Sequence, residues 1–399
     1  MPERGWDVVV VGGGLIGSAA AYHLALDGAS TLLVEQGDLA SGASGANFGL
    51  VQVQDAEFGL SLELTLKGYE AFSGLEAELD YDVGYQRTGS LLLIDNEQQW
   101  TTVQRRVDAL QAVGVDTHLL DRDEVCRLEP SLSPDSAIGA QYHADEGELN
   151  PFKLVQAYAL RGRQHGLEIR THSGVKQVCV EGGRVTGVDT NSGHIPAGWV
   201  VLAAGAWAGR LGHTAGIDLP LRWVHGEAFI TEPVAPLTRH SIGSAAFYEA
   251  TEGSDEQGVG FCLRQRPEGN VMLGEAAFVT QALGRRVTAS ALPAIARETW
   301  RRFPALRQVA VIRGWAIPVA FVPDNRPLLG PVPEVHGLLV ATGLKSTIVL
   351  TPLVGALIAD MVTGRKLDPR LTEFSPTRPM GAESRVYDQG AKTPRNTVP

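Results

Sequence analysis

The chain has 399 residues, of which 44% are hydrophobic and 20% are charged. A chain of this length and composition can bury a large hydrophobic core and is expected to form two domains. The formal net charge of −11 argues against nucleic acid as a partner, because a phosphate backbone requires a basic protein surface. No apolar segment reaches the roughly 20 residues needed to span a bilayer, so we expect no transmembrane segment.

The cysteines and the N-terminus bear on the compartment. Cys126, Cys179 and Cys262 are odd in number and widely spaced, and they include no CxxC pair. This usage favours reduced cysteines that serve in packing. The first apolar run lacks a basic leader and continues into a glycine turn, unlike a secretory signal peptide. We therefore expect a cytoplasmic protein.

The N-terminal segment WDVVVVGGGLIG predicts a buried strand and a dinucleotide-binding turn. Four consecutive valines precede the spacing Gly12-x-Gly14-x-x-Gly17, and an alanine-rich helical segment follows. Gly12 permits a tight turn, Gly14 lets the backbone approach a pyrophosphate, and Gly17 lets the helix pack close to the strand. The phosphate then lies at the helix N-terminus, where N–H groups are unpaired.

A second predicted strand, TLLVEQ, ends at Glu35, 18 residues after Gly17. A carboxylate at this spacing accepts hydrogen bonds from an adenosine ribose. Its negative charge would repel a 2′-phosphate, which disfavours NADP against NAD or FAD.

The next segment, SGASGANFG at 41–49, is a run of small residues. From this point the chain resembles the glycine oxidase, D-amino-acid oxidase and sarcosine oxidase superfamily, in which a serine- and glycine-rich segment wraps FAD. Three further segments match in order, at 145–166, 199–209 and 322–364, and the resemblance covers about residues 5–370. It implies an α/β fold with a Rossmann-like FAD-binding domain interleaved with a mixed β-sheet substrate domain.

The predicted FAD-binding residues lie in the glycine turn, after the second strand, in the small-residue segment, in the 175–209 region and before the last helix. They are Gly12, Gly14, Leu15, Ile16, Gly17, Glu35, Gln36, Ser41, Ser44, Gly45, Ala46, Asn47, Gly49, Val175, Ala204, Gly205, Trp207, Gly343, Leu344, Lys345, Ser346, Thr347 and Ile348. The resemblance also implies that Lys345 favours the anionic reduced flavin by adding positive charge at the ring edge. A solvated loop lysine is the equal alternative.

Departures from the family pattern concern the flavin. Sarcosine oxidases attach FAD through a cysteine whose position here is Ile317, and the dimethylglycine dehydrogenase type uses a histidine in a segment that matches 41–49, which has none. We therefore expect noncovalent FAD. The sequence shows no metal-ligand constellation, so we expect no metal. The lysine that activates oxygen near flavin N5 matches Met272, which favours a dehydrogenase over an oxidase.

A further departure concerns the substrate. D-amino-acid and glycine oxidases bind the substrate carboxylate through an arginine in a Trp-x-Gly-Leu-Arg-Pro stretch, and Val319 takes that place here. Because carboxylate recognition favours a planar guanidinium, Arg264 is the leading replacement, with Arg266 beside it. Arg222 and Arg313 are the next candidates.

Other candidate side chains lie nearby in the sequence. His225, Glu227 and Tyr248 belong to neighbouring segments of the predicted substrate domain, so His225 and Tyr248 join Arg264 and Lys345 as candidate catalytic residues. For each of them an ordinary packing or surface role is an alternative. A separate cluster, at His143, Asp145, Glu146 and Glu148, is interpreted as structural, because its loop spacing supplies no fixed set of metal ligands.

The predicted elements interleave two domains. The expected elements are helices at 60–80, 97–114, from Pro151 and at 288–303, a strand at 85–95, a turn-rich link at 119–132 and a β-meander at 166–205. The expected domains are an FAD-binding domain at 1–84, 141–209 and 319–375, a substrate domain at 85–140 and 210–318, and a flexible tail at 376–399.

The chain is most similar in length and motif layout to the β-type catalytic subunits of heteromeric opine, D-hydroxyproline or proline dehydrogenases and of hydrogen cyanide synthase. This implies hydride transfer to FAD from an amino acid or secondary amine of the opine, imino acid, glycine or sarcosine type. Partner subunits with further redox centres are then expected. Two alternatives stay open: a flavin-dependent 2-hydroxy acid dehydrogenase, and a non-catalytic flavin-binding or electron-relay subunit.

Overall fold

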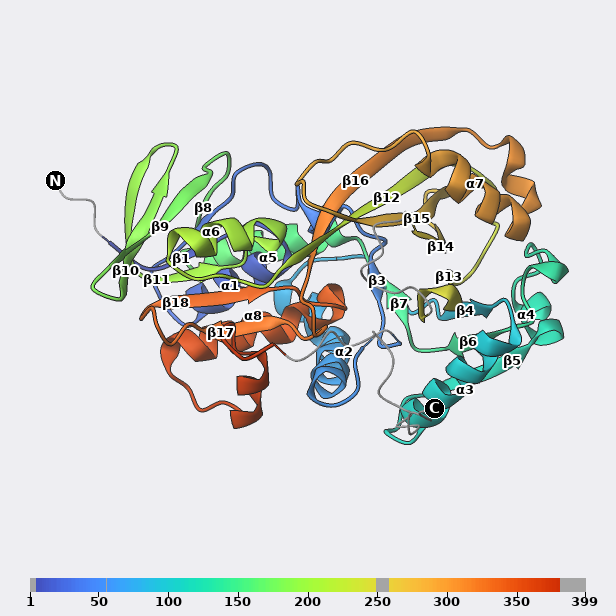
Figure 1. The fold of residues 1–399 in the computed structure, drawn as a ribbon, viewed down its shortest axis with the longest axis horizontal. Coiled ribbons are helices and arrows are strands. Elements are labelled where there is room, and N and C mark those ends of the chain that lie inside the picture. The colour runs from blue at the N-terminus through green and yellow to red at the C-terminus, as the bar shows by residue number, and fades with distance from the viewer. Residues whose placement is uncertain (1–4, 55, 249–257, 381–399) are drawn as a thin grey trace, which may run out of the picture.

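The computed structural model describes residues 5–54, 56–248 and 258–380. Two eight-stranded sheets and a two-stranded one organise the chain. Figure 1 shows the first sheet with its helices on one side of the molecule and the second sheet on the other, with the long strands β12 and β16 reaching between them. The structure is therefore mixed α/β, as the sequence predicted.

The first sheet has a parallel centre. Its strands run in the order β17 (Leu328–Pro331), β18 (Leu338–Thr342), β11 (Gly193–Leu202), β1 (Trp6–Val11), β2 (Thr31–Val34) and β8 (Glu168–Arg170), and β10 (Arg184–Thr190) and β9 (Val175–Glu181) extend from β11. β1 pairs in parallel with both β11 and β2. The predicted β-meander is confirmed as the antiparallel strands β9, β10 and β11.

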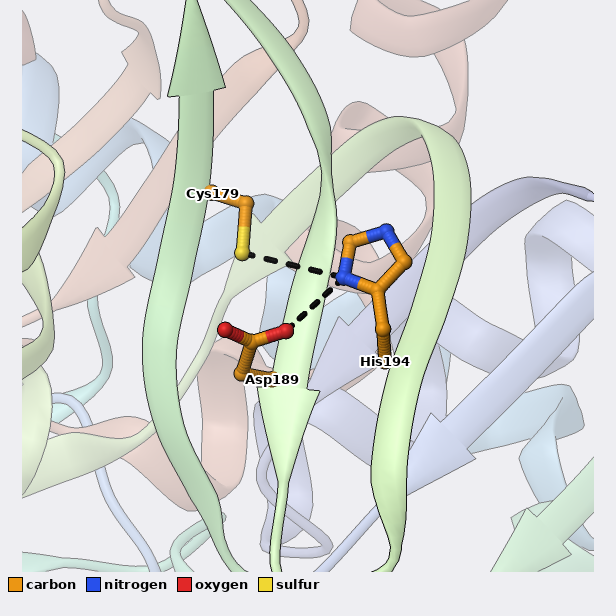
Figure 2. A group of neighbouring side chains, drawn as sticks. All are labelled: Cys179, Asp189 and His194. Atoms are coloured by element: carbon orange, nitrogen blue, oxygen red, sulfur yellow. Dashed lines mark hydrogen bonds and ion pairs between the residues drawn. The ribbon is translucent and has the colours of Figure 1, made fainter.

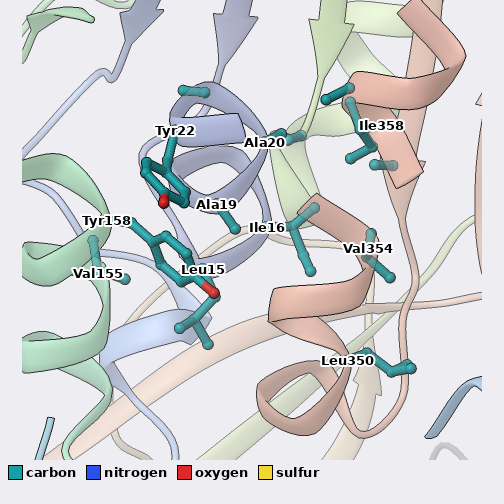
Figure 3. Close-up of a cluster of buried hydrophobic side chains, with 14 of the residues drawn as sticks. Leu15, Ile16, Ala19, Ala20, Tyr22, Val155, Tyr158, Leu350, Val354 and Ile358 are labelled. Atoms are coloured by element: carbon teal, nitrogen blue, oxygen red, sulfur yellow. The ribbon is translucent and has the colours of Figure 1, made fainter. Parts of the chain in front are cut away.

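The consecutive valines of β1 are explained by burial on both faces of this sheet. Val8 and Val10 belong to the cluster formed with α1 (Leu15–Leu26), α5 (Pro151–Gln164) and α8 (Thr347–Thr363). Figure 3 shows side chains of these three helices meeting, among them Ala19, Tyr158 and Val354. Val9 and Val11 belong to the cluster on the opposite face, which includes residues of β9, β10 and α6 (Ala208–Thr214). A strand covered on both faces carries a continuous apolar run rather than an alternating one.

The second sheet is mostly antiparallel. Its order is β16 (Val311–Phe321), β12 (Arg222–Pro233), β15 (Asn270–Thr280), β14 (Gly258–Gln265), β13 (Ser241–Ser244), β4 (Ser90–Ile94), β6 (Gly139–His143) and β5 (Thr117–Asp121). Only the β13–β4 pair is parallel among its described strand pairs. The two-stranded sheet pairs β3 (Leu50–Val51) with β7 (Gly147–Glu148).

The predicted helices are confirmed. They form α2 (Leu60–Leu79), α3 (Glu97–Gln111), α5 and α7 (Ala291–Arg302). Among the described residues, no helix has both the length and the apolar character required to cross a bilayer.

The predicted turn-rich link at 119–132 is wrong. It contains most of β5 and the helix α4 (Arg122–Leu128). Asp121 accepts a hydrogen bond from the N–H of Glu124 at 2.9 Å, and Glu124 accepts one from the N–H of Asp121 at 2.8 Å. This reciprocal capping box starts the helix, and the spacing Asp-x-x-Glu was its sequence signature.

The second sheet crosses two of the predicted domain boundaries, because β6 spans residues 139–143 and β16 spans 311–321. The division into domains stays a prediction. Arg378, within the predicted tail, forms an ion pair with Asp324 at 2.8 Å, and the flexible tail stays a prediction. Residues 381–399 lie outside the described residues.

A buried arginine stabilises the second sheet. Arg302, at the end of α7, is 1% exposed and lies 2.8 Å from Asp95 and 2.5 Å from Glu298. Its guanidinium lies 4.6 Å from the centre of the Phe261 ring. Arg301 pairs with the same two carboxylates at 3.3 Å, but its side chain is 41% exposed.

Arg302→Ala is expected to lower the free energy of unfolding by about 3 kcal/mol, because the buried ion pairs and the ring contact are lost. Arg301→Ala is the matched control and is expected to cost less than about 1 kcal/mol, because an exposed pair contributes little. Urea denaturation of the two variants provides the measurement. Equal losses of stability would show that burial does not distinguish these arginines.

Candidate cofactor site

A cavity of about 340 Å³ lies at the carboxyl ends of β1, β2, β11 and β18. Gly12, Glu35, Ala203 and Gly343 follow these strands and line it. In open sheets of this kind, ligands bind at the carboxyl ends of the strands, at the point where the order of the strands in the sheet reverses. β1, between β11 and β2, provides such a point.

The glycine turn after β1 is tightly packed. Gly12 has φ +112°, and a Cβ placed on it would lie 2.4 Å from the carbonyl oxygen of Ala203. A Cβ on Gly17 would lie 1.9 Å from the carbonyl oxygen of Gly12. The turn is thus closed to side chains at both positions, so a ligand at the start of α1 meets backbone N–H groups.

Glu35 fixes the same turn from the end of β2. One carboxylate oxygen accepts the N–H of Gly13 at 2.7 Å, and the other accepts the N–H of Gly37 at 2.8 Å. Each carboxylate oxygen has lone-pair capacity for a further donor. Because Glu35 also lines the cavity, it suits a ribose diol.

The small-residue segment 41–49 folds over the turn. Ser44 accepts the N–H of Leu15 at 2.9 Å, at the first residue of α1. The amide of Asn47 donates to the carbonyl of Ser44 at 2.7 Å and accepts the N–H of Gly49 at 2.8 Å. Asn47 therefore holds the shape of the segment, while its first residues face the cavity.

Most of the predicted FAD-binding residues line the cavity. Those that do are Gly12, Gly14, Leu15, Ile16, Glu35, Gln36, Ser41, Ser44, Val175, Ala204, Gly205, Trp207, Gly343, Leu344 and Thr347. Those outside its lining are Gly17, Gly45, Ala46, Asn47, Gly49, Lys345, Ser346 and Ile348. Contact of any of these residues with FAD stays a prediction. The closed turn, the acid and the helix N-terminus fit a dinucleotide.

Three cations that sequence reasoning missed also line the cavity: Lys176, Arg210 and Arg285. Arg285 donates to the carbonyl of Ser41 at 3.0 Å, and its guanidinium lies 5.2 Å from the centre of the Trp207 ring. Positive charge in the wall of this cavity suits a pyrophosphate. No motif marks these residues, because the folded chain brings them in from the start of β9, from α6 and from the segment after β15.

Arg264, the predicted substrate cation, does not line the cavity. Its side chain is 3% exposed, forms an ion pair with Glu148, and donates to the carbonyls of Phe48 and Leu149, the latter at 3.3 Å. Burial lowers the pKa of the guanidinium and Glu148 opposes that shift. These contacts pair Arg264 with an internal carboxylate and two backbone carbonyls, and they join β14 to the segments around β3 and β7. A substrate role for Arg264 stays a prediction, and these contacts favour a structural role instead.

Lys345 and His225, two of the other predicted catalytic residues, do not line the cavity either. Lys345 lies 3.5 Å from a carboxylate oxygen of Glu57 and is 12% exposed. The ring of His225 is buried, with Nε2 at 3.1 Å from Glu227 and 3.2 Å from the carbonyl of Arg286. These contacts favour packing roles over direct contact with a ligand. Tyr248 ends a short 3-10 turn at Ala245–Tyr248, and its side chain lies outside the described part of the structure.

Val319 lines the cavity, at the place where the resembling oxidases carry arginine. The other arginines that the sequence offered as replacements do not line the cavity either. Arg266 pairs with Glu268 at 3.3 Å, Arg313 is exposed on β16, and Arg222 starts β12. None of these three belongs to the lining of the described cavity.

Ile317 and Met272 are buried strand residues. Both lie in the second sheet, on β16 and β15, and neither lines the cavity. Ile317 offers no nucleophile for attachment of a flavin. The assignment of Met272 to the oxygen-activating position stays a prediction.

The structural interpretation of the His143 cluster is confirmed. Glu146 accepts the N–H groups of Val53 at 2.7 Å and Gln54 at 2.9 Å, and the hydroxyl of Ser90 at 2.5 Å. Burial lowers the pKa of His143, which holds the ring neutral. Glu148 is committed to Arg264. Asp145 is exposed and lies 3.7 Å from Arg87.

The parallel sheet, the glycine turn and Glu35 together define a dinucleotide-binding protein of the Rossmann type. The chain matches the family described as FAD dependent oxidoreductase over residues 7–361, and it belongs to this family. FAD is therefore its cofactor.

Several known proteins are similar to the chain along most of its length. Glycine oxidase of Geobacillus kaustophilus is 29% identical over 385 residues, covering 94% of this chain and 98% of that enzyme. Hydrogen cyanide synthase subunit HcnC of Pseudomonas aeruginosa is 27% identical, covering 92% of this chain and 94% of that subunit. The mitochondrial pyruvate dehydrogenase phosphatase regulatory subunit of the mouse is 27% identical. The match covers 85% of this chain and 39% of that protein.

The fold is also similar to that of a solved glycine oxidase. The crystal structure of glycine oxidase from Geobacillus kaustophilus superposes with a TM-score of 0.85 at 27% identity, covering 94% of this chain and 99% of that one.

Glu35→Ala is expected to raise the Kd for FAD by about 10- to 100-fold, which corresponds to about 1.5 to 3 kcal/mol for a hydrogen bond to a charged group. Titration of apoprotein with FAD, followed by flavin fluorescence, measures this Kd. Asp38→Ala is the control, because Asp38 lies three residues further on and its side chain is 82% exposed. An unchanged Kd in Glu35→Ala would remove the carboxylate from the cofactor site.

The flavin is expected to be noncovalent, because Ile317 replaces the cysteine and no histidine stands in 41–49. Acid precipitation of the purified yellow protein should leave FAD in the supernatant, identified by its chromatographic retention. A yellow pellet after washing would contradict this expectation.

Proposed function

We propose that this chain oxidises the C–N bond of an amino acid or secondary amine and passes the electrons to an acceptor other than oxygen. The observation that carries the C–N part of the proposal is the alignment with glycine oxidase, which covers nearly all of both chains. The acceptor part rests on Met272, which stands where the resembling oxidases carry the lysine that activates oxygen. Bound FAD supplies the two-electron acceptor for this oxidation. The side chains of this protein then bind and orient the substrate and the cofactor and shield them from water.

Cofactor retention is assigned to the cavity at the carboxyl ends of the first sheet. The N-terminus of α1 and Arg285 supply positive potential for the pyrophosphate, and Glu35 supplies acceptors for the ribose. Arg285 also covers the site, because it bridges the Ser41 carbonyl and the Trp207 ring. Such cover excludes water from the bound dinucleotide.

The substrate side of the proposal rests on Val319. Pro318, Val319 and Ala320 form an apolar part of the cavity wall. An apolar wall disfavours a charged ammonium, and the neutral amine is the form that can release a hydride. Because this wall supplies no guanidinium at residue 319, we infer a substrate that is not anchored through a carboxylate at that point.

A heteromeric assembly is part of the proposal. Its support is the alignment with subunit HcnC, which extends over 92% of this chain and 94% of that subunit. In such an assembly a partner subunit receives the electrons.

A substrate panel under anaerobic conditions tests the proposed reaction. Glycine, sarcosine, proline, an opine and 2-hydroxyglutarate are mixed separately with the oxidised holoprotein, and loss of the flavin absorbance is followed by stopped flow. We expect bleaching by at least one amine. Bleaching by 2-hydroxyglutarate alone would identify a hydroxy acid dehydrogenase, and no bleaching by any compound would favour a relay subunit. Either result would overturn the proposal.

The same preparation tests the acceptor. With the amine that bleaches the flavin, turnover with an artificial dye should exceed peroxide formation by at least about tenfold, a barrier difference near 1.4 kcal/mol. Dye reduction and peroxide are assayed in parallel at equal substrate. Equal rates would mean that the protein is an oxidase.

A further inference from the structure

We propose that Cys179, Asp189 and His194 bind one zinc ion on the outer face of the β-meander. These three residues offer a sulfur, a carboxylate oxygen and an imidazole nitrogen, all within 4.8 Å of one another. Sulfur, nitrogen and oxygen donors of these kinds are the ligands that Zn²⁺ takes in proteins. Figure 2 shows the three side chains pointing toward a common centre from adjacent strands.

The strand register explains why they meet. Asp189 on β10 lies directly opposite His194 on β11. Cys179 on β9 lies opposite Gly187, which is two residues before Asp189 on β10. Side chains two residues apart on a strand share a face, so the cysteine, the acid and the histidine are cross-strand and diagonal neighbours.

The sulfur–nitrogen distance is close to that of a tetrahedral site, and the nitrogen–oxygen distance is shorter than in one. Zinc–ligand bonds of usual length place sulfur and nitrogen ligands about 3.6 Å apart and nitrogen and oxygen ligands about 3.4 Å apart. Here Sγ of Cys179 lies 3.8 Å from Nδ1 of His194, and a carboxylate oxygen of Asp189 lies 2.8 Å from the same nitrogen. A small rotation of the half-exposed Asp189 and His194 side chains opens the shorter distance to the coordinated one.

The surroundings suit a divalent cation with one open position. The side chains of His194 and Asp189 are 46% and 44% exposed, so a water molecule can reach the fourth coordination position. Cysteine coordinates a metal as the thiolate, so zinc binding releases the proton of the Cys179 thiol to solvent.

The proposed ion lies apart from the cofactor cavity. None of the three ligands lines the cofactor cavity, and each comes from a different strand of the meander. A single ion would therefore cross-link β9, β10 and β11 through their side chains. Since a metal that binds only the folded state stabilises it by mass action, zinc should raise the melting temperature of the protein.

Cobalt(II) is the first probe, because it binds zinc sites and has visible spectra. The metal-free holoprotein, with FAD bound, is titrated with Co²⁺ and then with Zn²⁺. We expect one equivalent of Co²⁺ to give the intense long-wavelength bands of tetrahedral coordination, outside the flavin absorbance, and Zn²⁺ to abolish them. Zinc should also raise the melting temperature.

Variants separate the proposed site from adventitious binding. Cys179→Ser and His194→Ala should each weaken zinc binding by at least about tenfold. Replacing a residue that only hydrogen-bonds to a metal ligand already costs about that much affinity, so loss of a ligand should cost no less. Cys126→Ser and His213→Ala are matched controls, since His213 pairs with Asp218 at 3.2 Å without a thiol. These controls should bind like the unmodified protein. Absence of tetrahedral bands, or equal binding by the ligand variants and the controls, would overturn the proposal.

Discussion

The close approach of two backbone segments is the constraint on which the cofactor site depends. The carbonyl oxygens of Gly12 and Ala203 occupy the space that side chains at residues 17 and 12 would need. β1 and β11 can therefore lie side by side to their last residues, and α1 starts directly above them.

Buried charge joins the second sheet to the two-stranded sheet and to the end of the small-residue segment. Glu146 fixes the segment after β3 through two backbone N–H groups, and Arg264 reaches from β14 to Glu148 and to the carbonyl of Phe48. Buried ions of this kind are costly unless every partner is present. They thus specify the position of the small-residue segment against the second sheet, and with it one wall of the cavity.

The predictable part of this protein was local. The valine run, the glycine spacing and Glu35 each follow from the geometry of neighbouring residues, so the first strands, α1 and the acid could be predicted from sequence. The capping box at Asp121 and Glu124 was equally local, and the helix that it starts could have been found.

The remainder depends on contacts between distant segments. Arg264 has the type of side chain that binds a substrate carboxylate. Only the fold shows that its guanidinium contacts Glu148 and backbone carbonyls instead. Arg285 has no motif at all and joins the site through contacts that sequence spacing cannot predict. Cys179, Asp189 and His194 meet only because of the strand register.

The contact between Arg285 and Ser41 has a consequence for assembly of the holoprotein. These residues are 244 positions apart, and they belong to segments beside different sheets. The cavity is complete only after both halves of the chain have folded and met. A dinucleotide bound in the cavity therefore stabilises the arrangement of the two sheets relative to each other, by thermodynamic linkage. It does not act on the stability of either sheet alone. Loss of cofactor should accordingly loosen the joint between the sheets before it unfolds them.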